Sequence, residues 1–374
     1  MKLVIAKGEL QKGLGRIQAI VEKRNSMPIL ANAYLEATKA AGGSRLHIAA
    51  TDLEVGVRGS HEAEVSAPGS LTVSAKKLFE IVRELPDEPI QLASTANSYL
   101  EIQCPRSRFV LAGTAGDEYP TLSSASPKAM VRLQASLLSG MIERTMYAAS
   151  ADETRYNLNG VYFEVLPDTG KIRMVATDGH RLAYLDRVIA ADLSGLSSGV
   201  IFPRKGLSEL KRLVDEEDAD EVELGFEGNN AVARRGEVTL MMRLIEGEFP
   251  NYRQVLPKPP QHALVLEREP LVHALRRVSV LSVERSRSVK LEVQEGRLQI
   301  SSSNPDVGEG HEELEIDYAG EPLRLGFNAR YLLDALGVLQ AKEVQLGLHD
   351  ELSPVQIRPT DDADSLAVVM PMRI

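Results

Sequence analysis

The chain has 374 residues, of which 43% are hydrophobic and 26% are charged, a balance that excludes long disordered stretches and fits globular protein. Its formal net charge of −10 excludes a protein that covers nucleic acid with its whole surface, but leaves room for one basic face. The single cysteine, Cys104, excludes an intrachain disulfide and fits a reducing compartment. No apolar run approaches the length of a signal-peptide core or a membrane span, so we expect a cytoplasmic protein that does not contact membrane.

The first third of the chain predicts two helices among short strands. Apolar residues recur at helical spacing over 8–24, and this helix has to end before Met27-Pro28, because a residue that precedes proline avoids the helical region. A second helix is predicted over 75–85, before Pro86. Strands are predicted at 2–6, 33–39, 45–50, 53–65, 89–94, 99–103 and 107–112, followed by a Pro- and Ser-rich linker at 117–127.

The central and last thirds repeat this order of elements. Helices are predicted over 136–149, 204–214, 269–281 and 328–340, and Pro270 stands in a first turn, where its missing N–H costs nothing. The acidic run 215–221 is interpreted as a solvated loop rather than a metal site. Strands are predicted at 130–134, 159–166, 171–177, 184–190 and 199–202, in three segments up to about 245, and, after a second linker at 246–261, at 263–267, 289–293, 297–302, 312–317, 323–326, 343–349, 354–358 and 365–370.

One strand–turn unit recurs three times. The central copy is ATDGHRLA at 176–183, in which Thr177-Asp178 follows an alternating strand. Counting 126 positions back places Thr51-Asp52 on this pair, and counting 126 forward places Ser303-Asn304 on it. Since 374/3 is close to 125, the sequence predicts three similar domains.

The second helix of each third has a common register. Leu78, Leu207 and Leu332 stand at equivalent positions of SAKKLFEIV, PRKGLSELK and NARYLLDAL. Three copies of this order of strands and helices predict an α+β fold in which each domain packs two helices on antiparallel sheet.

The predicted helices are basic although the chain is acidic. Over 7–24, 75–85, 134–149, 203–214, 269–280 and 328–340 there are 16 Lys and Arg against 8 Asp and Glu, so that the helices carry +8 and the remainder −18. This segregation is expected when helices face a polyanion. Few aromatic residues accompany these bases, which favours phosphate contact without base reading over stacking on single strands. A basic polar face without any ligand is the alternative.

The sequence disfavours two other classes of function. The seven histidines are scattered without a zinc-binding spacing and no phosphate-binding Gly-Lys-Ser/Thr loop occurs, so catalysis is disfavoured, with Asp178 and His180 as the one acid–base pair considered. A sequence-specific DNA regulator would need a strongly basic domain and a helix that exposes groups for the major groove, which these short helices do not offer.

Seven motifs, taken together and in this order, resemble the bacterial DNA polymerase III β subunit family, the sliding clamps. They are MPIL at 27–30, RYNLNG at 155–160, ATDGHRLA at 176–183, PRKG at 203–206, EFPNYRQVLP at 248–257, FNARYLLDAL at 327–336 and VVMPMRI at 368–374, and the resemblance covers the whole chain.

This resemblance implies an α+β DNA clamp fold of three similar domains, at 1–125, 126–256 and 257–374, that assembles as a head-to-tail dimeric ring with pseudo-sixfold symmetry. Helices would line the hole and sheets would form the outer shell. The implied function is to encircle duplex DNA without sequence preference and to tether the replicative polymerase, with no catalysis, cofactor or metal. Further implied partners are the clamp loader and, through short linear motifs, repair and translesion polymerases.

The resemblance also implies site residues. Arg24 and Tyr156 would contact DNA, with Lys205 as a further phosphate contact, while Asn157 stands where relatives often have an aromatic residue and Gln254 where many have arginine. At the subunit interface, Arg106, Arg108, Phe109 and Leu111 of the first domain would meet Val280, Leu281, Glu309 and Glu312 of the third. A pocket for partner peptides would use Leu158, Thr177, Gly179, His180, Arg181, Leu182, Pro250, Val255, Asn328, Tyr331, Val368, Val369, Met370, Pro371, Met372 and Arg373. An ordinary edge strand at the Met-Pro-Met ending, and a purely structural turn at His180 and Arg181, are the alternatives.

Overall fold

The computed structural model describes residues 1–21, 27–40, 43–120, 126–152, 154–216, 220–283 and 286–373. Arg24 and the last part of the first predicted helix lie outside the described residues, as do 121–125 of the first predicted linker and 217–219 of the acidic run. No helix in the described ranges is long and apolar enough to cross a bilayer. Within the same ranges, no group of three or more His, Cys, Asp or Glu side chains is placed to hold a metal ion.

The chain packs as two compact units, Met1–Ala135 with Lys205–Leu244, and Ser136–Arg204 with Ile245–Ile374. Unit 1 contains one antiparallel sheet with the strand order β10-β15-β16-β17-β4-β3-β2-β6-β9-β8-β7-β1-β5. Its elements are β1 (Lys2–Ile5), α1 (Lys7–Ile17), β2 (Asn32–Ala40), β3 (Gly43–Thr51), β4 (Val55–Glu62), β5 (Glu64–Ala67), β6 (Gly69–Ser74), α2 (Ala75–Glu84), β7 (Ile90–Ser94), β8 (Tyr99–Cys104), β9 (Ser107–Ala115), β10 (Met130–Gln134), β15 (Glu221–Glu227), β16 (Asn230–Arg235) and β17 (Val238–Arg243). The helix α4 (Arg204–Val214) belongs to this unit from Lys205 onward.

Unit 2 contains two antiparallel sheets, β14-β11-β12-β13-β25-β24-β23-β18 and β21-β20-β19-β22. Its elements are α3 (Ala135–Met146), β11 (Gly160–Leu166), β12 (Lys171–Thr177), β13 (Arg181–Val188), β14 (Val200–Pro203), β18 (His262–Glu267), α5 (Arg268–Ser279), β19 (Ser288–Gln294), β20 (Arg297–Asn304), β21 (Gly308–Glu315), β22 (Leu323–Asn328), α6 (Ala329–Gly337), β23 (Glu343–Leu348), β24 (Val355–Pro359) and β25 (Ser365–Val369).

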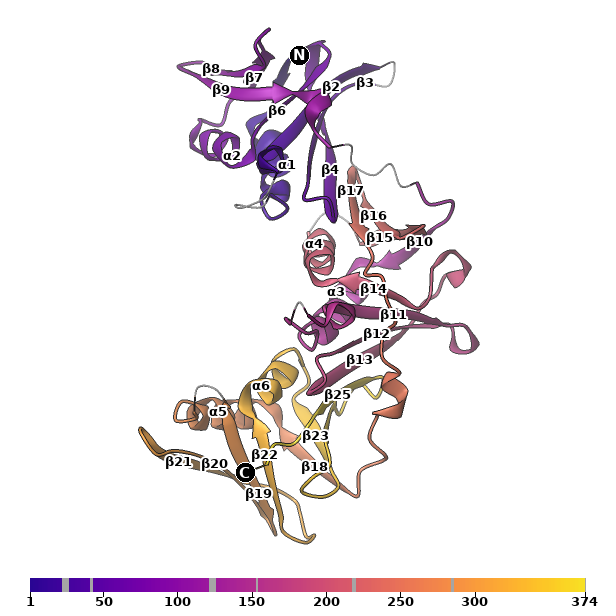
Figure 1. The fold of residues 1–374 in the computed structure, drawn as a ribbon, viewed down its shortest axis with the longest axis vertical. Helices are drawn as coiled ribbons and strands as arrows, with labels where there is room; N and C mark the ends of the chain where they lie inside the picture. Colours follow the sequence, from indigo (N-terminus) through magenta and orange to yellow (C-terminus); the bar gives the residue numbers. More distant parts are fainter. Residues whose placement is uncertain are drawn as a thin grey trace. The chain divides into compact units, whose positions relative to one another are not determined.

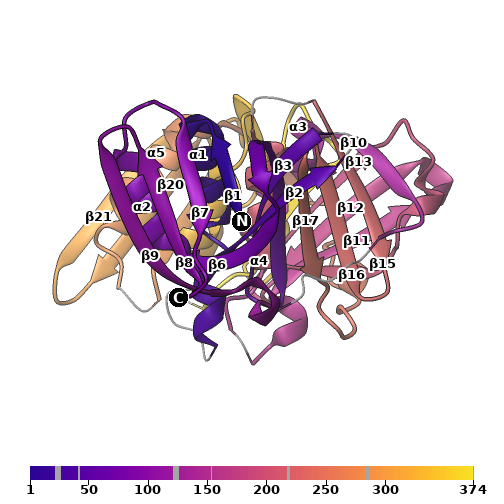
Figure 2. The ribbon, with the colours of Figure 1, turned by 90° about the horizontal axis from the view of Figure 1, so that it is seen from above.

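Two pairs of helices pack against these sheets, α1 with α2 and α5 with α6. In unit 1 the helices α1 and α2 contact each other, and strands β6 to β9 run side by side over them (Figures 1 and 2). The leucines at the common register, Leu78 and Leu332, are buried in α2 and α6. In unit 2, α5 and α6 contact each other and bury apolar side chains of β19, β20 and β22 in one core, which follows from the period-2 alternation of those strands.

The first helix is shorter than predicted. It ends at Ile17, because the Gln18 amide N–H bonds the Gly15 carbonyl at 3.4 Å in a tighter turn, while its side chain donates to the Leu14 carbonyl at 3.1 Å. The predicted strand 53–65 is two strands, β4 and β5, and β5 pairs with β1. The strands β13 and β21 begin earlier than predicted, at Arg181 and Gly308, since cross-strand pairing supports their polar first residues.

The strand–turn repeat is confirmed at the level of single hydrogen bonds. Thr51 Oγ1 donates to the Val55 carbonyl at 3.0 Å, and Thr177 Oγ1 donates to the Arg181 carbonyl at 2.7 Å. The carboxylate of Asp52 accepts the backbone N–H groups two and three residues later, and that of Asp178 does the same. In the third copy the Asn304 amide oxygen accepts the Asp306 N–H at 3.1 Å, so each turn is closed by its own Asx side chain.

A second repeated feature concerns the last strand of each third. On one side, the strands β17 and β25 each pair with a strand of the preceding third, β4 and β13 respectively. Just beyond these strands, Ile245 bridges Ile201 in β14, and Met372 bridges Gly326 in β22. The strand β9 likewise ends on β6, through Gly113, Thr114 and Ala115. Its earlier residues, 107–112, pair only with β8 within the described chain.

Candidate functional site

The candidate peptide pocket begins at the turn between β12 and β13. Thr177 and Asp178 shape this turn through side-chain hydrogen bonds, and Gly179 has a φ of 87° that glycine adopts without strain. His180 therefore lies in a turn and not on a strand. The Asp178 carboxylate is directed to the backbone and to Arg181, so it forms no acid–base pair with the His180 ring.

Arg181 is held on all sides. Its Nε donates to Asp178 Oδ2 at 3.1 Å and its Nη1 to Asp334 Oδ2 at 2.6 Å, while its guanidinium carbon lies 4.6 Å from the centre of the Tyr331 ring. The side chain is only 10% exposed. Such a planar, doubly paired arginine fixes the turn to the helix α6.

An apolar cluster forms a floor beside this turn. It contains three predicted pocket residues, Leu158, Leu182 and Val368, which are at most 8% exposed, together with Phe249 and Tyr252 of the linker. Arg181 and Leu182 pair with Val369 and Val368 across the β13–β25 ladder. The floor therefore combines residues from four separate stretches of sequence.

Exposed apolar residues flank the floor. Val255 is 64% exposed and Met370 is 44% exposed, and each follows a segment anchored in the apolar cluster. The Met370 N–H donates to the His180 carbonyl at 2.8 Å, and the Met372 N–H donates to the Gly326 carbonyl at 2.7 Å. Large apolar side chains held open to solvent by a rigid backbone are a feature of ligand sites.

The other predicted pocket residues lie in or near the same unit-2 surface. Asn328 caps α6 by accepting the Arg330 N–H at 2.9 Å, which orients Tyr331 in the first turn. Pro250 and Arg373 are exposed, and Pro371 is half-buried. A polar cleft of about 540 Å³ adjoins the turn and is lined by Tyr147, Ala149, Ser150, Ala151, Asp152, Arg155, Asp178, His180, Arg181, Arg204, Arg330, Tyr331 and Asp334.

Most members of this cleft were not among the predicted site residues, and three of them contact the turn at Asp178 and Arg181. Asp334 pairs with Arg181, Arg155 Nη1 donates to the Asp178 carbonyl at 2.9 Å, and Tyr147 places its ring centre 5.5 Å from the Arg181 guanidinium carbon. Asp334 and Arg330 are spaced i,i+4 in a helix that the motif FNARYLLDAL covers, but nothing in that spacing indicates a partner in the distant turn at Arg181.

The candidate DNA contacts differ in their exposure to solvent and in whether their charge is already paired. Tyr156 is 54% exposed and available, whereas the Lys205 ammonium forms an ion pair with the buried Asp52 carboxylate. Arg276, in α5, is exposed and has no ion pair within the described chain. Arg24 lies outside the described residues.

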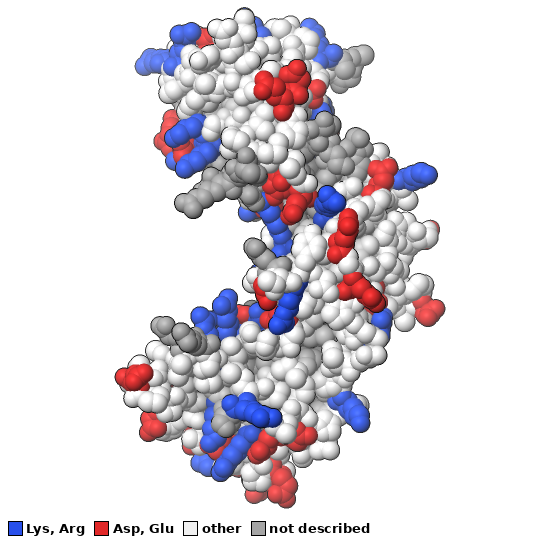
Figure 3. Space-filling view, viewed as in Figure 1, with Lys and Arg blue, Asp and Glu red and all other residues white. Residues whose placement is uncertain are grey.

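Several basic residues of the helices meet acids of neighbouring segments, and others pair within their own helix. The six helices as the structure has them hold 15 Lys and Arg and 7 Asp and Glu, again +8. Arg16 bonds Glu216, and Arg144 bonds Asp362 at 2.6 Å. Figure 3 accordingly shows blue and red side chains next to each other on each unit. The segregation counted along the sequence is therefore partly neutralised in space.

The candidate interface residues lie on or next to β9, on β21 and just beyond the end of α5. Phe109 and Val280 are 40% and 78% exposed. Arg108 pairs with Glu101, and Arg277 holds Glu312 at 2.6 Å, so the expected pairs of Arg108 and Glu312 across an interface would have to replace bonds within the chain. Arg106 and Glu309 have no ion pair within the described chain. Leu111 is half-buried, and Leu281 packs at Gly310.

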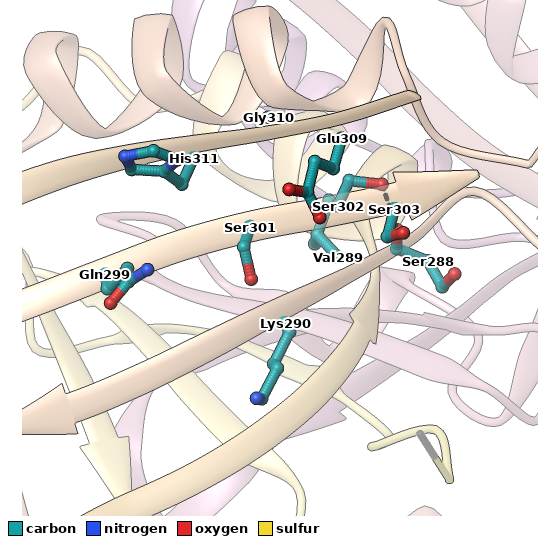
Figure 4. Close-up of a pocket in the computed structure, with 10 residues that line it drawn as sticks. All are labelled: Ser288, Val289, Lys290, Gln299, Ser301, Ser302, Ser303, Glu309, Gly310 and His311. Carbon is teal, nitrogen blue, oxygen red and sulfur yellow. Dashed lines mark hydrogen bonds between the residues drawn. The ribbon is translucent and has the colours of Figure 1, made fainter. Parts of the chain in front are cut away.

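A shallow pocket of about 450 Å³ lies beside this second edge. Figure 4 shows its side chains, Lys290, Gln299, Ser301 and His311 among them, spread over the neighbouring strands β19, β20 and β21. Glu309 and Gly310 of β21 also line it. The pocket is polar and continuous with the unpaired side of β21.

Comparison with known proteins agrees with this geometry. Models of the DNA polymerase III beta subunit match the chain three times, the N-terminal domain over 1–123, the central domain over 132–251 and the C-terminal domain over 253–373. The beta sliding clamp of Caulobacter vibrioides is 38% identical over 378 residues and is covered in full, as is this chain. Solved sliding clamps of C. crescentus and Bartonella birtlesii superpose over 100% of both chains, with TM-scores of 0.93 and 0.95 and identities of 37% and 35%.

Identity above 30% over the whole length, together with three family domains in the expected order, matches the triple repeat seen in the hydrogen bonds. The chain belongs to the DNA polymerase III beta subunit family, the beta sliding clamps.

Proposed function

We propose that two copies of this chain close head to tail into a ring around duplex DNA and tether the replicative polymerase, and that the protein itself catalyses no reaction. Each copy would contribute three domains, at 1–125, 126–256 and 257–374. The observation that carries this proposal is the repeated pairing of the last strand of each third with the preceding third. Among the residues that the structure describes, that pairing is made twice, and the third such pairing is not made.

The open positions are the two candidate interface strands. The strand β21 is the third-domain equivalent of β4 and β13, and within the described chain it pairs only with β20. The first part of β9 is equivalent to β17 and β25 and pairs only with β8. A third pairing, β21 of one copy with β9 of the other, would close the ring with the geometry already used twice.

The two existing ladders also predict the register of the third. Val55 pairs with Met242, and Arg181 pairs with Val369. The equivalent residues of β21 and β9 are Gly308 and Leu111. On the first strand, Val55, Arg181 and Gly308 each precede the residue that pairs with the repeated Thr51, Thr177 or Ser303. On the last strand, Met242, Val369 and Leu111 each stand three residues before the residue that bridges to the strand preceding the second helix, Ile245, Met372 and Thr114.

This register places Phe109 of one copy opposite Gly310 of the other, two residues further along an antiparallel pair. A side chain at Gly310 would meet Leu281 Cδ1 at 3.2 Å, so Leu281 lies directly beside the space that the glycine leaves. An aromatic ring fits such a space over an aliphatic side chain. His311 would lie opposite Arg108, and Glu309 would be diagonal to it, which supports an Arg108–Glu309 contact.

For the partner site, we propose that the apolar floor and its exposed flanks take short peptide segments of the polymerase, the clamp loader and repair and translesion polymerases. Sliding clamps of Pseudomonas aeruginosa and B. birtlesii were solved with griselimycin bound. The apolar anchors of such a ligand would bury Val255 and Met370, while Arg155 and Arg181 supply polar contacts at the rim.

For DNA, we propose loose phosphate contact by Tyr156, Arg24 and unpaired helical bases such as Arg276. Lys205 would contribute only after exchanging Asp52 for a phosphate, since its charge is already paired. Weak contacts of this kind suit a ring that stays on DNA by topology and has to slide.

The test is retention on nicked circular DNA before and after linearisation, combined with sizing in solution. A ring loaded onto the circle should remain during gel filtration and leave when one cut opens the circle, and proteins bound at both ends of the cut DNA should restore retention. A monomer that stays on unblocked linear DNA would refute the proposal. A companion variant lacking Met370–Ile374 should lose partner peptides and remain a dimer.

A further inference from the structure

The linker between β17 and β18 carries two pocket residues, Pro250 and Val255, and is held against the sheet by a closed set of charged and phenolic groups. We propose that Tyr252, with Glu164 and Arg173, is the positioning device of this pocket wall and sets its affinity for ligands without touching them. This inference rests on the proposed partner site.

Tyr252 is the central member. It is 2% exposed, and its hydroxyl donates to Glu164 Oε1 and accepts from Arg173 Nη1 at 3.1 Å. Burial, followed by the hydrogen bond to Glu164, raises the pKa of Tyr252 to about 12, so the phenol keeps its proton and continues to donate.

The neighbours of Tyr252 are fixed in turn. Asp186 accepts two bonds from Arg173, at 2.5 and 2.6 Å, and the Arg173 guanidinium carbon lies 4.5 Å from the centre of the Tyr184 ring. Arg253 Nη2 reaches both oxygens of Glu164, at 2.9 and 2.7 Å. Two carboxylates and two guanidinium groups thus balance in charge around one phenol, and each buried charge has a partner.

The wall has a second tether before Tyr252, and beyond Val255 the Gln356 Nε2 donates to the Lys258 carbonyl at 2.6 Å. Asn157 Nδ2 donates to the Glu248 carbonyl at 2.9 Å, and the Phe249 ring stacks on Tyr162 with centres 4.9 Å apart. The residues that follow Tyr252 form one short turn, in which the Val255 N–H bonds the Tyr252 carbonyl at 3.1 Å. The position of the exposed Val255 side chain therefore depends on where Tyr252 is held.

Loss of the hydroxyl should loosen the wall rather than remove a ligand contact. A ligand would then have to order the wall on binding, and the cost of that ordering lowers its affinity. The affinity of a Tyr252→Phe protein for griselimycin should fall about tenfold, the size expected for one hydrogen bond to a charged group. The matched control is Tyr162→Phe, which removes a hydroxyl from the same aromatic cluster but outside this set of bonds, and which should bind as the unmodified protein does.

A double-mutant cycle separates positioning from general destabilisation. In a Val255→Ala background, which already lacks the positioned side chain, Tyr252→Phe should cost less than about threefold. In a Met370→Ala background, on the other flank of the floor, it should still cost about tenfold. Asn157→Ala, which cuts the second tether at a half-buried site, gives an independent readout should Tyr252→Phe unfold, and a severalfold loss is expected.

Unchanged affinity of Tyr252→Phe, or an equal loss in the Val255→Ala and Met370→Ala backgrounds, would overturn the inference while leaving the partner site intact. Failure of the unmodified dimer to bind griselimycin at all would overturn both.

Discussion

Leu53 and Gly179, 126 positions apart, adopt the same left-handed backbone conformation, with φ of 80° and 87°. Each is the third residue of a Thr-Asp turn whose hydrogen bonds require that conformation. Glycine adopts it freely, whereas a leucine pays for its Cβ. The first turn can accept that strain because Leu53 is 55% exposed and its side chain meets no crowded surface.

The second turn has no such room. A Cβ at Gly179 would come within 3.1 Å of Arg155 Nη1, the atom that bonds the Asp178 carbonyl. We expect Gly179→Ala to lower the free energy of unfolding by about 1–2 kcal/mol and to weaken griselimycin binding. Leu53→Gly is the control, expected within about 0.5 kcal/mol of the unmodified protein in urea denaturation. A loss of unfolding free energy in Leu53→Gly as large as that in Gly179→Ala would contradict this difference between the two turns.

Arg181→Ala should be more costly than any other change of an arginine around the cleft. It leaves Asp178 and Asp334 without their buried partner, which costs about 3 kcal/mol. Arg330→Ala removes a 61% exposed side chain that lies 3.7 Å from the same Asp334, and should cost less than about 0.5 kcal/mol. Thermal unfolding of both variants measures this difference. Similar unfolding midpoints for the two variants would show that Arg181 does not stabilise the fold by joining the turn to α6.

The sequence predicted the elements well because each depends on local signals. Period-2 alternation marks β12, whose predicted range matches the structure, and the apolar spacing of α4 gives its bounds without error. The strand β21 was predicted too short because its Glu309, His311 and Glu313 are polar, and only pairing with β20 reveals it as a strand. The end of α1 at Ile17 was not predicted. Hydrogen bonds of Gln18 end this helix, and no Gly or Pro marks the position in the sequence.

The sequence placed some residues of the candidate pocket that the fold brings together, but not the electrostatics around them. Leu158, Leu182 and Val368 do share one cluster. The pairing of Lys205 with Asp52 joins residues more than 150 positions apart, and no spacing rule indicates it. The net charge of the helices was likewise correct as a count, but acids such as Glu216 and Asp362 come from loops that fold back on the helices.

Gly310→Leu should prevent dimerisation. The new side chain would occupy the space beside Leu281 that the proposed register assigns to Phe109 of the other copy. Overpacking of this kind costs about 1–3 kcal/mol per site, and a head-to-tail ring has two such sites. Sedimentation at micromolar concentration should show a monomer. Val265→Asp, on the exposed face of the edge strand β18, is the control and should stay dimeric; a dimeric Gly310→Leu would exclude the register.

His61 should make unit 1 sensitive to acid. Its ring is 3% exposed and lies against Gly13, Ile48 and Gly59; Nδ1 bonds Glu9 Oε2 at 3.1 Å, and the buried Nε2 has no partner. Burial lowers the pKa of His61, with smaller effects of Arg16 and Lys12 in the same direction, and outweighs Glu9, which raises it.

The unfolded chain therefore takes up the proton first, so stability is full above the ordinary histidine pKa of about 6.5 and declines as the pH falls below it. Urea denaturation between pH 7.5 and 5 should show this decline, partly flattened in His61→Gln and unchanged in His349→Gln, whose ring is exposed. A slope that survives His61→Gln in full would assign the acid sensitivity elsewhere, with His47, whose pKa burial also lowers, as the next residue to change.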